Sequence, residues 1–269
     1  MAFRGASADA VAALTGELEA DASSPDIAAS VADDLFSAAA TLRSEAALRR
    51  FATDASIPSQ AKSGLINEVF AGKIHDVSLS VLASAVGRRW VAGRDLADAL
   101  EHLGVVAYVK AAGSETPRLA DELFGFAQAV KDSPELRDAL ADPVRSADDK
   151  RRLIGSLLEG KALAATVALA GQSISGSHRT VVVALTEYQK VVADVQAQGV
   201  ATVRVARPLP DAEVDRLAAV LTAQYGRPVH LNLLVDPSVL GGIRVEIGDD
   251  VIDGTVASRL DDARRRLVG

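Results

Sequence analysis

One stretch of this chain occurs twice, and the second copy follows the first at a fixed offset of 88 positions. The segment DDLF at 33–36 returns as DELF at 121–124, and residues 31–74 align with 119–162 without a gap, giving 13 identities in 44 positions. The alignment also matches a helix-breaking glycine, Gly72 with Gly160. Self-similarity at a fixed period marks a duplicated structural unit. Chance similarity between two alanine- and leucine-rich regions does not account for an ungapped match of this kind.

The repeated part has the hydrophobic periodicity of α-helices. Val11, Leu14 and Leu18 lie at helical spacing in a first helix over 5–21, and Ser24-Pro25 can start the next one. Further helices are expected near 45–53, from 58 to 72, and over 76–90 and 94–111. The spacing therefore predicts a six-helix bundle in residues 1–112 and a second, duplicated helical unit in residues 113–199, with the helix at 94–111 able to serve both.

From residue 200 the period changes from helical to two, which is typical of β-strands. Strands are expected over 200–205, 229–235 and 243–247, with a helix capped by Asp211 after the first strand, a hairpin turn at 248–250 and a final helix over 256–267. Val229, Leu231, Leu233 and Val235 are expected on one face of their strand, with His230 and Asn232 on the other. The fold class is therefore mainly α, two related helical units followed by a small α/β domain at 200–269.

Composition excludes several classes of function. The net charge of −7 argues against a nucleic-acid partner, and the absence of cysteine excludes disulfides and thiolate metal sites. The sequence contains no run of about 18 apolar residues, so no membrane span is predicted. The histidines share no metal-ligand spacing, and packing is expected for Trp90, the only tryptophan. No catalytic residue, metal site or cofactor is predicted. The histidines are His75, His102, His178 and His230.

One segment, from Gly155 to Lys161, matches the spacing of a phosphate-binding P-loop except that Ala162 replaces the magnesium-binding Ser or Thr. A P-loop follows a buried strand, whereas residues 148–154 have the pattern of a helix start. A helix that ends at Gly160 is the favoured interpretation. The alternative is a nucleotide-dependent enzyme that uses this segment and loses nucleotide affinity in Lys161→Ala.

The tail of the chain has a dense pattern of glycine, aspartate and arginine, reading VDPSVLGGIRVEIGDDVIDGTVASRL at 235–260. This pattern resembles the C-terminal signature of the ATP synthase delta subunit family, whose mitochondrial relative is the oligomycin-sensitivity-conferring protein. Upstream, the helical unit with Leu48-Arg49, Lys62 and Arg89 resembles the six-helix bundle of the family. Usual members have one helical unit, and the doubled form resembles that of actinobacteria. The signature positions are Asp236, Gly241, Gly242, Gly248, Asp253, Gly254 and Arg259.

The resemblance implies a non-catalytic stator subunit on the cytoplasmic side of the cell membrane, attached to the membrane only through the ATP synthase complex. Its bundle would hold the N-terminal helices of the alpha subunits, and its C-terminal domain would hold the b-type peripheral stalk, so that rotor torque drives ATP synthesis. By analogy, the alpha helix would lie in a groove between the first and fifth helices. A generic helical scaffold with other partners is a further alternative. The groove positions are Ala8, Val11, Ala12 and Thr15, facing Leu79, Leu82, Ala83 and Val86.

Overall fold

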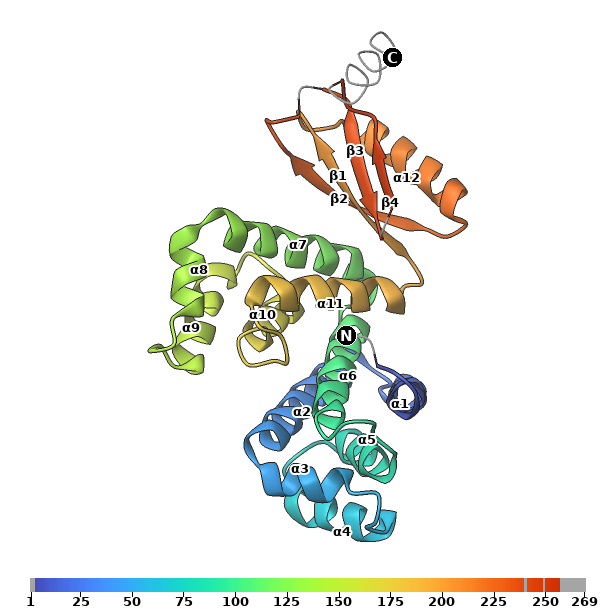
Figure 1. Cartoon of the computed structure of the whole chain (residues 1–269), viewed down its shortest axis with the longest axis vertical. Coiled ribbons are helices and arrows are strands. Elements are labelled where there is room, and N and C mark those ends of the chain that lie inside the picture. The colour runs from blue at the N-terminus through green and yellow to red at the C-terminus, as the bar shows by residue number, and fades with distance from the viewer. Residues whose placement is uncertain (1–2, 240, 249, 257–269) are drawn as a thin grey trace, which may run out of the picture. The chain divides into compact units, whose positions relative to one another are not determined.

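A computed structural model describes residues 3–239, 241–248 and 250–256 (Figure 1). It divides into two compact units, Met1–Val192 and Ala193–Gly269, which we describe separately. The first is helical and the second contains a four-stranded sheet, so the predicted fold class is confirmed. The predicted boundaries at 112–113 and 199–200 stay predictions. Among the described residues, no helix has both the length and the apolar character needed to cross a membrane.

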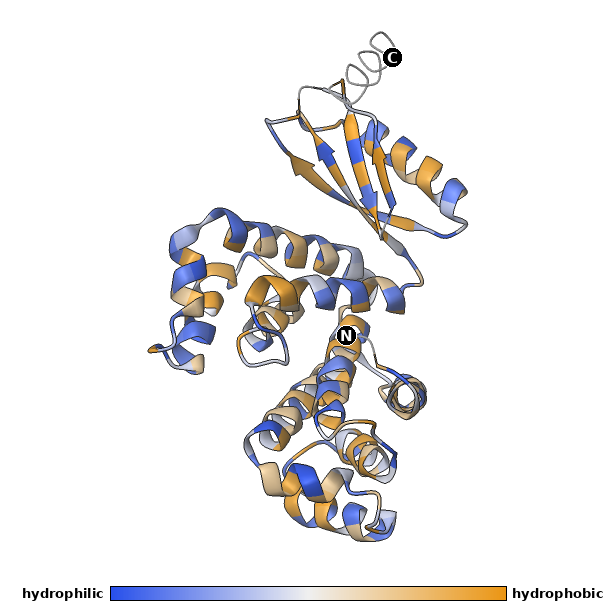
Figure 2. Ribbon diagram, viewed as in Figure 1, coloured by the Kyte–Doolittle hydropathy of each residue, from blue (hydrophilic) through white to orange (hydrophobic). Residues whose placement is uncertain are grey.

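The helices of the first copy begin and end close to the predicted positions. Ser24 caps the second helix, because its side-chain oxygen accepts a hydrogen bond from the Ile27 N–H at 3.3 Å, and Pro25 occupies the first helical position. Hydrophobic and hydrophilic residues alternate in bands along the helices (Figure 2), as amphipathic packing requires. The elements are α1 (Ala6–Asp21), α2 (Pro25–Ser44), α3 (Ala46–Thr53), α4 (Ser59–Phe70), α5 (Asp76–Gly87) and α6 (Asp95–Ala112).

The second copy repeats this order at the predicted offset. After the 3₁₀ turn η1 (Gly113–Glu115), three of its helices begin 88 positions after their counterparts: α8 after α3, α9 after α4 and α10 after α5. The first helix of the bundle has no counterpart of its own in this copy. The helices are α7 (Thr116–Asp132), α8 (Pro134–Ala141), α9 (Ala147–Leu158), α10 (Ala164–Gln172) and α11 (Val181–Val195).

The two copies also share their hydrogen bonds. In the first copy, Asp34 Oδ2 accepts from the His75 N–H at 2.8 Å and from Ser78 Oγ at 2.7 Å. In the second, Glu122 Oε2 accepts from the Leu163 N–H at 2.8 Å and from Thr166 Oγ1 at 2.5 Å. All three pairs of positions differ by 88, so a carboxylate on α2 or α7 holds the start of α5 or α10 in the same way.

Helix α6 lies at the centre of the first unit and packs against helices of both copies, α1 and α2 in one and α7 and α10 in the other. It approaches α2 closely at Gly104, where an added Cβ would lie 2.4 Å from the ring of Phe36. That ring stacks on Tyr108 with centroids 5.9 Å apart. Position 104 therefore requires glycine, because any side chain would clash with Phe36. The packing of α6 against both copies agrees with the inference that this helix serves both.

A buried ionic cluster joins the copies next to α6. Glu101, only 1% exposed, accepts from Arg43 at 2.5 Å, from the hydroxyl of Tyr188 at 2.6 Å and from the Ser177 N–H at 2.8 Å. Gly176 lets the backbone close over this carboxylate, since a Cβ there would lie 2.2 Å from Glu101 Oε1. Burial and the neighbouring Glu101 charge raise the pKa of Tyr188 well above its usual range, so the phenol stays a hydrogen-bond donor.

The second unit is a sheet in the order β2-β1-β3-β4, with β1 and β2 parallel and the other pairs antiparallel. One face packs on α12 (Asp211–Tyr225) through Ala201, Val203, Val245 and Leu221. Parallel pairing of β1 and β2 requires a crossover, which α12 provides. The strands are β1 (Gly199–Val205), β2 (Val229–Val235), β3 (Ile243–Ile247) and β4 (Asp250–Asp253).

Two details of this unit differ from the sequence prediction. Asp211 is the first residue of α12 and Pro210 is its cap, because Asp211 already has helical backbone. Burial along β2 does not follow the alternation either: Asn232 is buried, while Leu233 and Val235 are 37% and 46% exposed. β2 is an edge strand, and the helix side of its second half is only partly covered. The final helix predicted over 256–267 lies outside the described residues, apart from its first position.

Candidate functional site

The positions predicted from the family resemblance to form a groove lie on α1 and α5, which pack against each other. The eight positions differ in accessibility. Leu82 and Val86 are 1% and 0% exposed and belong to the core, and Val11 is also buried. Ala12 is exposed, and the other four are half-buried: Ala8, Thr15, Leu79 and Ala83. The surface available to a partner is thus made mainly of small side chains, above a floor of buried aliphatic residues.

The ends of α1 and α5 are fixed by hydrogen bonds around the groove. Ser7 Oγ, at the start of α1, donates to Asp95 Oδ2 at 2.7 Å and accepts from the Val91 N–H at 2.9 Å. Further along, Arg88 at the end of α5 forms an ion pair with Glu17 of α1 at 2.5 Å. These contacts connect both ends of α1 to neighbouring parts of the bundle.

The glycines of the C-terminal signature have a structural function in the second unit. Gly241 and Gly242 have φ of 136° and 83°, a region that favours glycine, and a Cβ on Gly242 would lie 2.4 Å from the carbonyl oxygen of Gly254. Two strand ends therefore cross at backbone contact distance. The Gly254 N–H donates to the Ile243 carbonyl at 2.9 Å and the Val256 N–H to the Gly241 carbonyl at 3.0 Å, closing the crossing.

The signature aspartates fix turns. Asp236 Oδ1 accepts from the N–H and the hydroxyl of Ser238, and Asp253 Oδ1 accepts from the same groups of Thr255. These hydrogen bonds lower the pKa of both carboxyls below the usual range. Gly248 has a φ of 58° in the turn between β3 and β4. Arg259 lies outside the described residues.

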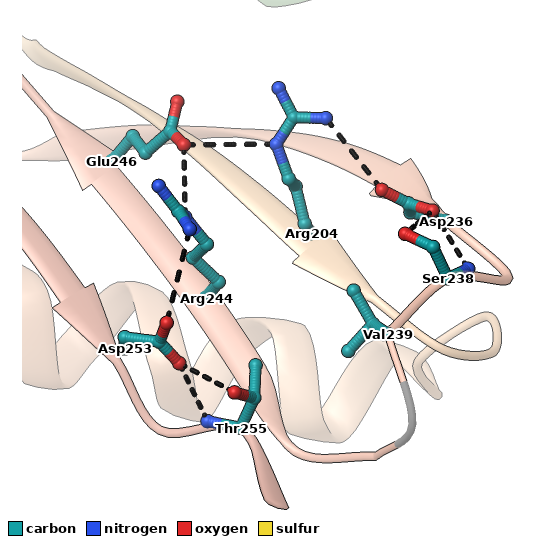
Figure 3. A pocket seen from close by; sticks show the side chains of 8 residues that line it. All are labelled: Arg204, Asp236, Ser238, Val239, Arg244, Glu246, Asp253 and Thr255. Atoms are coloured by element: carbon teal, nitrogen blue, oxygen red, sulfur yellow. Dashed lines mark hydrogen bonds and ion pairs between the residues drawn. The ribbon is translucent and has the colours of Figure 1, made fainter. Parts of the chain in front are cut away.

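The sheet face opposite α12 carries a row of alternating charges (Figure 3). Arg204 lies 3.9 Å from Asp236 and 3.7 Å from Glu246. Arg244 lies 3.1 Å from Glu246 and 3.9 Å from Asp253. Together they line an open hollow of about 470 Å³. Sequence reasoning missed this row, although the period-two positions of Arg204, Arg244 and Glu246 on neighbouring strands could have indicated a polar face.

The P-loop-like segment does not form a phosphate cradle. Residues 155–158 are the last turn of α9, Gly160 has a φ of 72° just beyond the helix, and Lys161 Nζ donates to the Leu157 carbonyl at 3.1 Å. A phosphate cradle needs free backbone N–H groups in a loop, whereas these belong to a helix. Nor does the described part of the chain contain a group of three or more His, Asp or Glu residues placed to hold a metal ion.

A helical bundle with small side chains on the accessible faces of α1 and α5, followed by a compact α/β unit held by backbone contacts, contains no catalytic or metal-binding constellation among its described residues. The family model of the ATP synthase delta (OSCP) subunit matches residues 106–267. The chain belongs to this family, and it is a non-catalytic stator subunit and not an enzyme.

Three relatives match along most of their length, and each is called ATP synthase subunit delta. That of a Nocardioides species is 59% identical over 99% of this chain and 98% of its own. That of Kineococcus radiotolerans is 47% identical over 88% of this chain and 87% of its own, and that of Streptomyces avermitilis is 39% identical over 99% of both. The recognition of the family from its signature is thereby confirmed, and the nucleotide-dependent enzyme has no support.

Proposed function

We propose that this chain holds the N-terminal helices of the ATP synthase alpha subunits in the groove between α1 and α5, and the b-type peripheral stalk through its C-terminal unit. It would do so on the cytoplasmic side of the cell membrane, as a peripheral part of the complex. The connection keeps the catalytic head from turning with the rotor, so that rotor torque drives ATP synthesis. In this proposal residues 1–112 bind the head, residues 200–269 bind the stalk, and residues 113–199 lie between them in the chain.

The observation that carries the proposal is the composition of the accessible face of α1 and α5. Ala8, Ala12 and Ala83 leave room for the backbone of a third helix to approach closely, and Leu79 adds a partly exposed apolar side chain. An amphipathic helix binds such a groove through its apolar face. Binding of this kind needs a fixed receiving surface, and the hydrogen bonds of Ser7 and the ion pair of Arg88 supply it.

Calorimetric titration of the full chain with a peptide copied from an alpha N-terminus tests the head contact. We expect Ala12→Asp and Ala83→Asp to weaken binding by about tenfold or more, because each puts a charge into the apolar contact. Ala40→Asp on α2 makes the same change at an exposed position away from the groove and should leave the affinity unchanged. Val11 and Leu82 are unsuitable positions, because a charge there disrupts the core. Absence of measurable binding by the parent chain would refute the head contact.

A second titration, with the C-terminal segment of a b-type subunit, tests the stalk contact. We expect it to bind the parent chain and the Ala12→Asp variant equally, since the two contacts lie in different units. A chain that binds neither the alpha peptide nor the b segment would instead be a scaffold for other partners. The nucleotide-dependent alternative predicts that millimolar ATP raises the unfolding temperature of the parent chain and that Lys161→Ala removes this effect. We expect ATP to leave the unfolding temperature of the parent chain unchanged.

A further inference from the structure

A hollow of about 400 Å³ opens in the second helical copy, away from the α1–α5 groove. Its floor is apolar and includes the buried side chains of Val130, Leu140 and Val181. Four elements form it: α7, α8, the first turn of α9, and the connection from α10 into α11. The remaining lining residues are Arg137, Ala141, Lys150, Ser173, Ile174, His178, Arg179, Thr180 and Val182.

The ionisable groups around this hollow are all basic. Arg137, Lys150 and Arg179 line it together with His178, and no aspartate or glutamate does. Arg137 Nη1 donates to the Lys131 carbonyl at 3.4 Å, which is a contact with a neutral group. No carboxylate of the described residues lies within ion-pair distance of Lys150 or Arg179, whereas neighbouring Arg151 and Arg152 pair with Asp148 and Asp149. The hollow therefore has uncompensated positive charge in a chain of net charge −7.

An aromatic side chain stands at the equivalent position of the first copy. Trp90 occupies the position of His178, and its Nε1 donates to the Ala85 carbonyl at 3.0 Å, so the indole lies over the counterpart of Ser173. The smaller imidazole of His178 instead meets the ring of Tyr188 edge-on, with centroids 5.9 Å apart. Arg179 replaces the apolar Val91 of the first copy. The second copy thus has a smaller side chain and an added positive charge at this place.

We propose that this hollow binds an acidic peptide segment of a partner protein, with one apolar side chain on the floor between Val130 and Leu140 and with carboxylates on Lys150 and Arg179. Buried apolar side chains and cations line the same hollow, which suits an apolar side chain flanked by Asp or Glu. Free inorganic phosphate would use the cations and leave the floor uncovered. The site is independent of the head contact, because the α1–α5 groove belongs to the other copy.

Fluorescence anisotropy with overlapping short peptides that span the alpha, beta and b-type subunits tests the proposal on the full chain. We expect a peptide that carries acidic residues beside Leu, Ile or Phe to bind, with an affinity that falls as salt is added. The double variant Lys150→Glu/Arg179→Glu should weaken it by about tenfold or more. The matched control Arg152→Glu/Lys161→Glu makes the same change of charge on exposed residues of the same copy outside the hollow and should change the affinity less than about twofold.

A third variant, His178→Trp, separates shape from charge. It places the larger tryptophan of the first copy in the lining of the hollow and leaves Lys150 and Arg179 intact, so we expect it to abolish binding of the same peptide. Equal binding by the parent and Lys150→Glu/Arg179→Glu chains would overturn the proposal, as would absence of any bound peptide. So would binding to phosphatidylglycerol vesicles in place of peptides, if the double variant removed it. Circular dichroism of each variant checks that the helices are retained.

Discussion

The two helical copies share the same backbone arrangement but differ in the side chains that follow the fifth helix. Both hold the start of a helix with a carboxylate, Asp34 in one and Glu122 in the other, and both end a helix with a glycine at the same offset. They differ where the fifth helix of each copy leads to the next, because Trp90 hydrogen-bonds to the Ala85 carbonyl in the first copy, whereas His178 lines a hollow in the second. Capping and turn residues therefore preserve the fold of a duplicated unit, while the side chains that follow its fifth helix differ in size and charge.

The joint between the copies has no counterpart inside either copy, and it should show the largest effect on stability. The positions that correspond to Arg43 and Glu101 in the second copy are Lys131 and Gln189, so the ion pair occurs once. Glu101→Ala would leave a largely buried Arg43 without its main partner, and Nη1 of that arginine already lacks a hydrogen bond in the described structure. We expect a loss of about 3–5 kcal/mol in the free energy of unfolding.

Urea denaturation followed by the fluorescence of Trp90 measures this loss in the helical unit. Asp98→Ala is the control, because Asp98 contacts the same arginine at 3.2 Å but leaves Glu101 in place. Burial raises the pKa of Asp98 despite the opposing effect of Arg43, so its charge is less favourable there and its removal should cost about 1 kcal/mol. Equal losses in the two variants would mean that Glu101 is not the group that joins the copies.

Exchanging the side chains of Trp90 and His178 should give the next largest effect on the free energy of unfolding. Trp90→His would remove part of a side chain that packs against the core, and we expect it to cost about 2 kcal/mol, less than the loss for a fully buried tryptophan because Trp90 is half-buried. Thermal unfolding followed by circular dichroism measures it, since the variant lacks tryptophan. The reverse change, His178→Trp, should be neutral or stabilising because it fills a hollow. A loss of the same size in both variants would mean that His178→Trp does not fill the hollow of the second copy.

The sequence was sufficient for the helix boundaries of both copies because short-range signals determine them. Ser24-Pro25 starts a helix, Gly72 and Gly160 end two, and the offset of 88 transfers each boundary from one copy to the other. The family signature was also readable, since its glycines are fixed by local backbone geometry and by the crossing of Gly242 with Gly254.

Features that depend on three-dimensional packing could not be read in this way. The burial of Leu82 and Val86 depends on how α5 packs in the bundle, so the predicted groove mixed core positions with accessible ones. The row of charges around Arg204 and Arg244 depends on the register between β1 and β3. The basic hollow needs residues from α8, α9 and the α10–α11 connection, which are up to 42 positions apart, Arg137 and Arg179 being the most distant of its cations.

The paired carboxylates offer a test of equivalence between the copies. Asp34→Ala and Glu122→Ala each leave one backbone N–H and one hydroxyl without an acceptor, and each should cost about 1.5 kcal/mol of unfolding free energy. Similar losses would show that the two carboxylates have the same function. Loss in one variant only would mean that the shared geometry is not matched by shared energetics.

The contribution of Glu122 to stability should depend on pH. Burial by itself would raise the pKa of Glu122, but the hydrogen bonds from Thr166, the Leu163 N–H and Arg118 hold it below the ordinary value. A lowered folded-state pKa contributes stability that is complete above the unfolded pKa of about 4.3 and is lost as the pH falls through the folded value. The Glu122→Gln chain should therefore be less stable than the parent near neutral pH. Its stability should also fall less than that of the parent when the pH is lowered below about 4.3. Parallel pH profiles for the parent and Glu122→Gln chains would contradict this contribution.

The smallest effect is expected at the repeated glycine. Gly72 and Gly160 both have a φ of 72° beyond the ends of α4 and α9, and an added Cβ would meet no atom within 4 Å at either. The cost of Gly→Ala is then that of the left-handed backbone alone, about 1 kcal/mol at each position. Urea denaturation of Gly72→Ala, Gly160→Ala and the double variant measures it, and the two losses should add because the sites share no contacts. Losses that differ by more than about 0.5 kcal/mol would mean that a neighbouring contact, and not the shared turn, sets the cost in one copy.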